Sequence, residues 1–371
     1  MSNAIANGVA GAGGGIIAQI ITYPLQTVNT RQQTERIAKS KRSTAASTNT
    51  LLQILHVVRT EGWGGLYSGL KPSLFGTAAS MGIYYYFYQL FKNKAEAIAV
   101  ARKLKGHGDG SVGMFSWLVV AALAGSLNVL LTNPIWVLVT RMQTQTQAER
   151  KIMESKREAL MREATENSFT ASILQEKLDE LDSTKPHPYG TIHAAREIYS
   201  EAGIRGFWKG IIPTLIMVCN PSIQFMIYET SLKRLKEKRA ANKQGVKNVT
   251  ALEVFLLGAL AKLGATVTTY PLLVVKSRLQ AKQEIGGIGN TSLRYSGTVD
   301  AIIKMIRYEG LPGFYKGMST KIVQSVFAAS VLFMVKEELV KAYMFLVDKI
   351  SKVQLKAIKW DDEYSLEVVG F

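Results

Sequence analysis

The sequence predicts an all-α membrane protein in which three pseudo-symmetric repeats form a six-helix bundle around a central cavity. Each repeat would supply two transmembrane helices and a short surface helix. Three observations predict this fold: a proline motif that occurs three times, a glycine motif that occurs three times, and six apolar runs placed around them. Motifs that return at a corresponding place in each third of a chain indicate repeated structural units.

The proline motif reads TYPLQTVNTRQQ at 22–33, TNPIWVLVTRMQ at 132–143 and TYPLLVVKSRLQ at 269–280. In each copy an arginine stands seven residues after the proline, and a glutamine stands nine residues after it. A proline inside a helix removes a backbone hydrogen bond and costs about 3 kcal/mol. Its presence in all three copies predicts that three helices share a proline kink.

The glycine motif reads GWGGLYSG at 62–69, GIRGFWKG at 203–210 and GLPGFYKG at 310–317. Each copy follows a short amphipathic segment, which predicts the surface helix, and precedes an apolar run. The six apolar runs are each near the ~20 residues that a membrane-spanning helix needs. They cover about 4–29, 74–91, 115–139, 211–228, 252–276 and 318–335.

These motifs divide the chain into repeat 1 (1–105), repeat 2 (106–245), repeat 3 (246–343) and a C-terminal tail (344–371). Repeat 2 carries a charged insertion at about 148–185, which we expect to be a solvated helical excursion. The insertion is either a tolerated loop or a regulatory or partner-binding segment. The basic loop at 233–248 lies on the side of both termini, which predicts that the termini are cytosolic.

Charge and composition narrow the function classes. The formal net charge of +17 predicts affinity for anions: nucleic acid, lipid headgroups or a charged solute. Nucleic-acid binding is disfavoured because the positive charge lies in loops between apolar runs. The single cysteine, Cys219, excludes a disulfide framework and a multi-cysteine metal site. The glycine run at 8–15 lacks the preceding strand that a dinucleotide-binding enzyme would need, so we expect no enzyme of that class.

Six apolar runs in three repeats, each with these two motifs, resemble the mitochondrial carrier family over residues 4 to about 343. The family pattern is Pro-x-acid-x-x-base-x-base-x-Gln, and this chain keeps the proline, the second base and the glutamine three times. The resemblance implies that the kinked helices close a central cavity on the organelle-interior side. Neighbouring helices can then satisfy the carbonyl that each proline leaves free.

The chain departs from the family pattern at this gate. The three acidic positions hold Gln26, Trp136 and Leu273, and the first basic positions hold Asn29, Val139 and Lys276. The usual three ion pairs cannot form between these side chains. We expect closure to depend on packing of Trp136, Val139 and Leu273, and on hydrogen bonds among Gln26, Asn29 and Lys276. The predicted interior-side gate is Pro24, Gln26, Asn29, Gln33, Pro134, Trp136, Val139, Gln143, Pro271, Leu273, Lys276 and Gln280.

The resemblance also implies a gate at the opposite, cytosolic end. Its predicted residues are Gln89, Lys92, Glu229, Lys233, Glu337 and Lys341. In the fourth and sixth helices the glutamate and the lysine are four residues apart. At that spacing they can pair within one helix, so an intrahelical pair is as good an interpretation as a gate between helices.

Positions that differ between the repeats are the candidates for binding an asymmetric solute. Nine residues before each proline stand Gly15, Gly125 and Lys262. A lysine in mid-membrane costs about 2.5–3.5 kcal/mol and suggests a functional site. We expect Lys262 to meet an anion such as a pyrophosphate; the alternatives are that it snorkels or pairs with a carboxylate. Lys321 and Lys276 would be a second and a third cation.

The resemblance places further contacts seven and eight residues after the last glycine of each glycine motif. There Gly76 leaves space, Met217 either meets a purine or packs between helices, and Gln324 offers hydrogen bonds. Asn220, beside Pro221, points either to the cavity or to a neighbouring helix. The predicted substrate-binding residues are Gly76, Thr77, Met217, Val218, Asn220, Lys262, Lys321, Gln324 and Ser325.

Within the family, a tryptophan at the position of Trp136 resembles the pattern of the nucleotide and folate branches. The chain as a whole resembles peroxisomal carriers of NAD and related adenine-containing cofactors. The resemblance implies an antiporter that exchanges NAD for AMP or ADP, with coenzyme A, ATP/ADP/AMP or FAD as alternative cargo. It implies a monomer in contact with membrane lipid, with no prosthetic group, no metal and no enzymatic activity. It also implies a multi-pass protein of the peroxisomal membrane or, alternatively, of the mitochondrial inner membrane.

Overall fold

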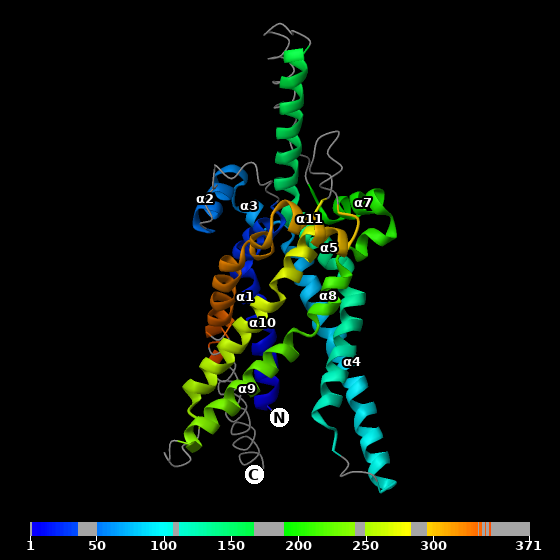
Figure 1. Ribbon diagram of the computed structural model, residues 1–371, viewed down its shortest axis with the longest axis vertical. Coiled ribbons are helices and arrows are strands. Elements are labelled where there is room, and N and C mark those ends of the chain that lie inside the picture. The colour runs from blue at the N-terminus through cyan, green and yellow to red at the C-terminus, as the bar shows by residue number, and fades with distance from the viewer. Residues whose placement is uncertain are drawn as a thin grey trace, which may run out of the picture. The chain divides into compact units, whose positions relative to one another are not determined.

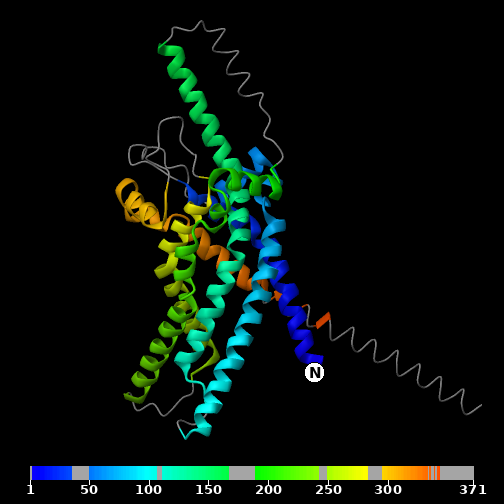
Figure 2. The same ribbon diagram turned by 90° about the vertical axis from the view of Figure 1, so that its right-hand side faces the viewer.

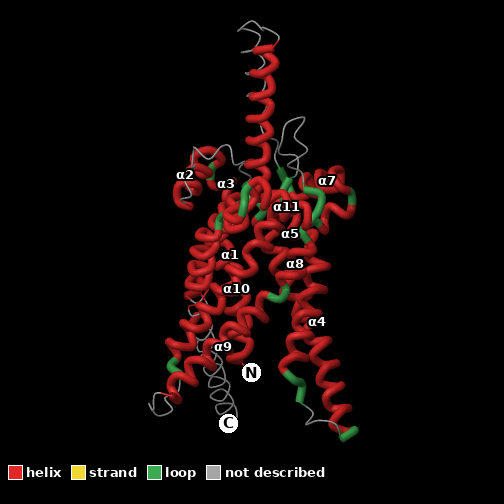
Figure 3. Tube along the Cα trace, viewed as in Figure 1, coloured by secondary structure: helices red, strands yellow, loops and turns green. Residues whose placement is uncertain are grey.

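The structure is a computed structural model that describes residues 2–35, 50–106, 111–166, 189–241, 249–282 and 295–332, together with 334, 335, 338, 341 and 342. Every regular element in this part of the chain is a helix, as the tube drawing shows (Figure 3). The predicted all-α class is therefore confirmed. The predicted Glu337, the end of the insertion (167–185) and the tail (344–371) lie outside the described residues.

The chain forms two compact units. The smaller unit combines Met1–Pro24 with Ile322–Phe371, and the larger unit is Leu25–Lys321. Helix α1 (Ser2–Thr34) contributes its first part to the smaller unit and its last part to the larger one. The described remainder of the smaller unit is helical: it is the end of a helix that covers residues 318–332, together with residues 334, 335, 338, 341 and 342.

Along the chain one order of elements repeats: a long helix, a short amphipathic helix, a glycine turn and a second long helix. In the first repeat α1 is followed by α2 (Thr50–Glu61), α3 (Trp63–Leu66) and α4 (Leu70–Leu104). The second repeat contains α5 (Met114–Glu166), α7 (Thr191–Ala202), η2 (Ile204–Trp208), α8 (Ile211–Met217) and α9 (Asn220–Ala241). The third contains α10 (Ala251–Gln280), α11 (Thr298–Tyr308), η4 (Leu311–Tyr315) and the helix that begins at residue 318.

Long helices pack in pairs within the larger unit: α4 lies along α5, and α9 lies along α10. The two pairs lie apart at the ends near Leu104 and Ala241 (Figure 1). They come together at the other end, where α7 and α11 are found (Figures 1 and 2). The amphipathic helices therefore gather at the end where the helix pairs meet.

Three stretches are long and apolar enough to cross a membrane: Met114–Glu149, Ile204–Arg239 and Leu252–Gln280. They correspond to three of the six predicted apolar runs. Large apolar side chains on them are exposed, including Phe115 at 78% and Phe255 at 66%. Exposed apolar surface of this extent is typical of a surface that meets lipid rather than water.

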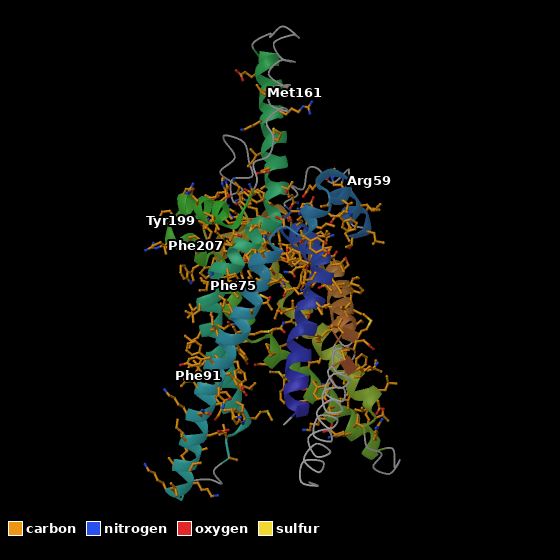
Figure 4. The ribbon with its side chains drawn as sticks, turned by 180° about the vertical axis from the view of Figure 1, so that it is seen from behind. Arg59, Phe75, Phe91, Met161, Tyr199 and Phe207 are labelled. Carbon is orange, nitrogen blue, oxygen red and sulfur yellow. The ribbon has the colours of Figure 1, made fainter. Side chains whose placement is uncertain are left out.

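Helix α5 continues beyond its apolar stretch to Glu166, and Met161 lies on this projecting part (Figure 4). The predicted helical excursion at 148–185 is therefore helical as far as Glu166. Its helix is continuous with the membrane-length part of α5 rather than separate from it.

The three motif prolines lie inside helices α1, α5 and α10, as predicted. In α5 the structure shows how the lost hydrogen bond is replaced. Pro134 cannot donate to the carbonyl of Leu130, and the indole Nε1 of Trp208 donates to that carbonyl at 2.9 Å instead. A neighbouring element thus satisfies the carbonyl freed by the proline.

The fourth apolar run differs from its prediction because it is not one helix. Helix α8 ends at Met217, and α9 begins at Asn220. Between them the amides of Val218 and Cys219 bond to carbonyls three residues back, in the tighter 3₁₀ manner. Pro221 is the second residue of α9, where a missing amide hydrogen costs nothing because the first turn has no acceptor for it.

The glycine motif produces the same backbone turn in all three repeats. Its first and last glycines have positive φ, between 58° and 82°, which side chains with a Cβ rarely adopt. The middle glycine provides space: a Cβ at position 65 would lie 2.5 Å from the carboxylate of Glu61, and one at 313 would lie 2.8 Å from Cβ of Glu309. These two glutamates belong to the site described next.

Candidate functional site

The arginines of the proline motif form three buried ion pairs. Each pairs with a glutamate at or next to the end of the amphipathic helix of its own repeat. Arg31 Nη1 lies 2.8 Å from Glu61 Oε1, Arg141 Nη2 lies 2.5 Å from Glu201 Oε2, and Arg278 Nη2 lies 2.9 Å from Glu309 Oε2. The Arg278 side chain is 0% exposed and that of Glu309 is 7% exposed.

The same arginines also join each repeat to the next. The Nε of Arg31 donates to the carbonyl of Gln143 at 2.9 Å. Arg141 donates in the same way to Gln280 at 3.2 Å, and Arg278 donates to Gln33 at 3.0 Å. Because the third bond returns to the first repeat, the bonds form a closed circle, which we call the arginine ring (Arg31, Arg141 and Arg278 with Glu61, Glu201 and Glu309).

The ring corrects the prediction that this end of the bundle closes without ion pairs. The positions holding Gln26, Trp136 and Leu273 carry no acid, but three glutamates elsewhere provide the charge. The sequence did contain a signal for them. A glutamate stands directly before the glycine motif in TEG and YEG, and two residues before it in SEAG, once in each repeat.

Two of the three motif glutamines reinforce the ring across repeats. Gln33 Oε1 accepts a hydrogen bond from Ser277 Oγ at 2.7 Å, and Gln280 Oε1 accepts one from Thr140 Oγ1 at 3.1 Å. Gln143 is equally buried, but its Nε2 has no hydrogen-bond partner among the described residues. The contact between repeats 1 and 2 is therefore bonded differently from the other two.

The expected hydrogen bonds among Gln26, Asn29 and Lys276 do not form within the described residues. Asn29 Nδ2 instead donates to the carbonyl of Gly317 at 2.6 Å, and its Oδ1 accepts from Gln33. Of the three residues expected to pack at this gate, Val139 is buried, and Leu273 packs against the buried cluster around Val274. Trp136 Nε1 lies 3.4 Å from Ser80 Oγ on α4.

One further ion pair joins repeats 2 and 3. Lys282, which follows α10, pairs with Glu197 on α7, and the hydroxyl of Tyr189 donates to the same carboxylate. Burial alone would raise the pKa of Glu197, but the bonds from Lys282 and Tyr189 hold it below its ordinary value. Burial and the neighbouring Glu197 charge raise the pKa of Tyr189. No repeat motif contains this pair, so the sequence pattern did not predict it.

At the opposite end, the predicted gate residues bond within their own helices. Gln89 Nε2 donates to Asn93 Oδ1 at 3.0 Å, and Lys92 lies 3.9 Å from Glu96. Lys233 lies 3.9 Å from Glu237 rather than pairing with the predicted Glu229. In the smaller unit, Lys341 pairs with Glu338 at 2.8 Å. Lys233 and Lys341 therefore pair within their own helices, but Lys233 does so with Glu237 and not with the predicted Glu229.

The three predicted lysines all belong to the larger unit. Lys262 is exposed on α10, while Lys276 on α10 and Lys321 on the last helix are half-buried. Lys321 is close enough to both of the others for their charges to interact. Among the described residues, neither the Lys262 nor the Lys276 ammonium has a carboxylate oxygen within 4.0 Å. This part of the unit therefore concentrates positive charge.

Several other predicted contact residues lie at helix–helix contacts. Gly76 does not leave open space: a Cβ there would lie 2.9 Å from Cγ2 of Ile135 on α5. Val218 meets Gly125 just as closely, at 2.7 Å by the same measure. Asn220 Nδ2 donates to Thr269 Oγ1 on α10 at 2.7 Å, which favours its helix-contact interpretation.

The remaining predicted contact residues are not brought together by these contacts. Met217 is half-buried at the end of α8, and Thr77 Oγ1 donates to the Ser73 carbonyl within α4 at 3.0 Å. Gln324 is buried and Ser325 is half-buried, both in the smaller unit. Among the described residues, no group of three His, Cys, Asp or Glu side chains could hold a metal ion.

Comparison with known proteins gives the same family over most of the chain. The family described as "Mitochondrial carrier protein" matches residues 1–97, 173–239 and 247–346. A peroxisomal nicotinamide adenine dinucleotide carrier of Arabidopsis thaliana is 63% identical over 94% of this chain and 98% of its own length. A mitochondrial nicotinamide adenine dinucleotide transporter of the same plant is 28% identical over 91% of this chain and 79% of its own length.

A third relative, the peroxisomal membrane protein PMP34 of Mus musculus, is 29% identical over 91% of this chain and 93% of its own length. The family match reaches all three repeats and includes all three copies of the glycine motif, together with the copies of the proline motif at 22–33 and 269–280. The chain belongs to the mitochondrial carrier family.

Proposed function

We propose that this protein is an antiporter that carries NAD across an organellar membrane in exchange for AMP or ADP. Its six long helices would form a threefold pseudo-symmetric bundle around one central site. That site would open alternately to the two sides, as in other carriers built from repeats. The protein would act without a prosthetic group and without catalysing a reaction.

The observation that carries the proposal is the concentration of lysines on the larger unit. Lys321 lies close enough to both Lys262 and Lys276 for their charges to interact, and neither Lys262 nor Lys276 has a carboxylate beside it among the described residues. Like charges held together repel one another, so such a cluster favours an anionic ligand. The diphosphate of a dinucleotide supplies the matching charge.

The 63% identity to the Arabidopsis peroxisomal carrier supports NAD as the cargo and the peroxisomal membrane as the location. A mitochondrial inner membrane is the alternative, because a mitochondrial NAD transporter is also similar. We further propose that the termini face the cytosol and that the carrier works as a monomer surrounded by lipid.

The arginine ring would form the gate on the organelle-interior side. All three of its ion pairs are made in the structure, whereas Lys92 and Lys233 at the cytosolic end bond within their own helices. This combination corresponds to a carrier closed toward the organelle interior. During exchange the ring would have to break, and contacts at the cytosolic end would have to form.

The test is counter-exchange in liposomes that contain the purified full-length chain. Liposomes loaded with AMP should take up external NAD, and the rate should fall at least tenfold in Lys262→Ala. Lys94→Ala is the matched control, because Lys94 is an exposed lysine on α4 outside the proposed site. Wild-type uptake of NAD by the Lys262 variant would refute the lysine site.

The alternative cargo molecules are coenzyme A, ATP, ADP, AMP and FAD, which share an adenine and a phosphate group with NAD. The same liposomes should be tested with each of them as the external substrate. A carrier that exchanges one of these but not NAD would keep the anion site and change the assigned cargo.

A further inference from the structure

We propose that Tyr84 and Tyr88 on α4 form a platform that binds the positively charged nicotinamide ring of NAD. The two phenol rings are stacked, with centroids 5.8 Å apart and planes inclined by 21°. Tyr84 is 38% exposed, so part of its ring is available to a ligand. The inference rests on the proposed function and adds a second contact region to it.

The tyrosine pair lies on the polar face of α4. Tyr84 follows Thr77 by seven residues, and Tyr88 and Lys92 follow at four-residue steps, so all four side chains share one face. The opposite face carries Phe75, Tyr86 and Leu90, which are 67%, 64% and 37% exposed. An exposed apolar helix face is typical of a face that contacts lipid. A helix face that carries a lysine is typical of one that lines a water-filled cavity. The stretch lies between Phe75 and the labelled Phe91 (Figure 4).

The depth of the platform follows from the repeats. Gly125 in repeat 2 corresponds to Lys262 in repeat 3, because both stand nine residues before the motif proline. Val218 corresponds to Thr77 in the same way, and Val218 packs against Gly125. In the threefold pseudo-symmetric bundle of the proposed function, Lys262 and Thr77 would therefore lie at similar levels. Tyr84 lies seven residues from Thr77, which is about 10 Å along the axis at 1.5 Å per residue.

Charge decides which end of the dinucleotide this platform suits. The nicotinamide ring of oxidised NAD is a pyridinium cation, and three ammonium groups near the diphosphate would repel it. Tyrosine faces attract a cation through the negative electrostatic potential above the ring. With the diphosphate on the lysines, the pyridinium would therefore lie toward the tyrosines. AMP has no such ring and would not use the platform.

The experiment compares substrates in the liposome assay, using full-length protein. We expect Tyr84→Leu to raise the half-saturating concentration of NAD about three- to tenfold, the range of a partly desolvated cation–π contact. The half-saturating concentration of AMP should change by less than about twofold, because AMP has no cationic ring to contact the tyrosine. Tyr84→Phe should behave as wild type, because the aromatic face is kept. Tyr86→Leu, a change on the opposite face, is the matched control and should alter neither value.

NADH gives a second readout, because its dihydronicotinamide ring is neutral. Wild type should bind NAD more tightly than NADH at equal phosphate charge, and Tyr84→Leu should reduce that preference. If Tyr84→Leu raised the half-saturating concentrations of NAD and AMP equally, or changed neither, the proposed tyrosine platform would be refuted. Failure of the wild-type protein to exchange NAD at all would instead overturn the proposed function. Uptake of AMP by each variant shows that it is folded.

Discussion

At the scale of single residues, the arginine ring provides ion pairs at the end of the bundle where the acidic residues of the family's proline motif are absent. Arg278 and Glu309 are almost inaccessible to solvent, and both Nη atoms of the arginine bond the carboxylate. Removing both partners of a buried pair is often neutral, but removing one leaves an unpaired buried charge. The ring is therefore expected to be sensitive to single substitutions.

Glu309→Gln should destabilise the protein by about 3–5 kcal/mol, because it leaves the Arg278 guanidinium buried without a counter-charge. Thermal unfolding in detergent should show a clear fall in Tm relative to wild type. The control is Glu338→Gln, which removes one partner of a 68–69% exposed pair and should change stability by less than about 1 kcal/mol. Similar Tm values for the two variants would show that the ring contributes little.

The same pair predicts a dependence on pH. Burial alone would raise the pKa of Glu309, but the bonds from Arg278 and the charge of Lys316 lower it below its ordinary 4.5. A lowered pKa means that the stabilisation is complete above pH 4.5 and is lost as the pH falls through the lowered value.

The difference in Tm between wild type and Glu309→Gln should therefore be largest near pH 7 and shrink below the ordinary carboxylate pKa of 4.5. Thermal unfolding of both proteins over a pH series measures it. A difference that stays constant down to the acid limit of the assay would contradict the linkage.

At the scale of elements, glycines permit the close contacts between long helices. Gly125 on α5 receives the side chain of Val218 from the segment between α8 and α9. Gly76 on α4 receives Ile135 from α5 in the same way. Gly76 was expected to leave space for a ligand, and the structure instead assigns both glycines to helix packing.

Gly125→Ala should destabilise the protein by about 1–3 kcal/mol, because its Cβ would overlap Cγ1 of Val218 and overpacking is costly. Adding Val218→Ala should restore most of the lost Tm. Gly82→Ala is the control: no atom lies within 4 Å of a Cβ there, so the change should be neutral or stabilising. Equal effects at both glycines would indicate helix propensity rather than packing.

At the scale of the whole molecule, the repeats provide the scaffold and their differences provide the chemistry. All three repeats have the proline, the glycine turn and the arginine–glutamate pair. The lysines at 262, 276 and 321 belong to repeat 3 alone, and the Glu197–Lys282 pair joins repeats 2 and 3 alone. A scaffold of three similar repeats that differ at a few side chains is suited to binding a ligand whose two ends differ chemically.

The proposed orientation predicts which side of the membrane each loop reaches. In a Cys219→Ser background, Ser111→Cys before α5 should react with a membrane-impermeant maleimide added to intact peroxisomes. Ser200→Cys on the exposed face of α7 should react only after the membrane is opened. The reverse pattern would place the termini inside the organelle and would exchange the two gates.

Sequence patterns predicted the helical class, the prolines inside three helices, and the family, and they marked the glycine motif that forms a turn in each repeat. They did so because these features depend on local chemistry: a proline restricts its own turn, and a glycine with positive φ marks its own bend. The arginines were noticed as part of a repeat, but their partners were not. Those partners lie 30, 60 and 31 residues further along the chain, beyond the reach of any local pattern.

The sequence by itself therefore determined the helical class, the three helices that contain the motif prolines, and which lysines lack counterparts in the other repeats. Only the tertiary structure decided that the glutamates before the glycine motif neutralise the arginines. It also showed that Gly76 is filled by Ile135, and that Asn220 bonds to Thr269 on α10. The physical reason is that charge pairing and packing depend on distance in space, whereas a repeated motif records only distance along the chain.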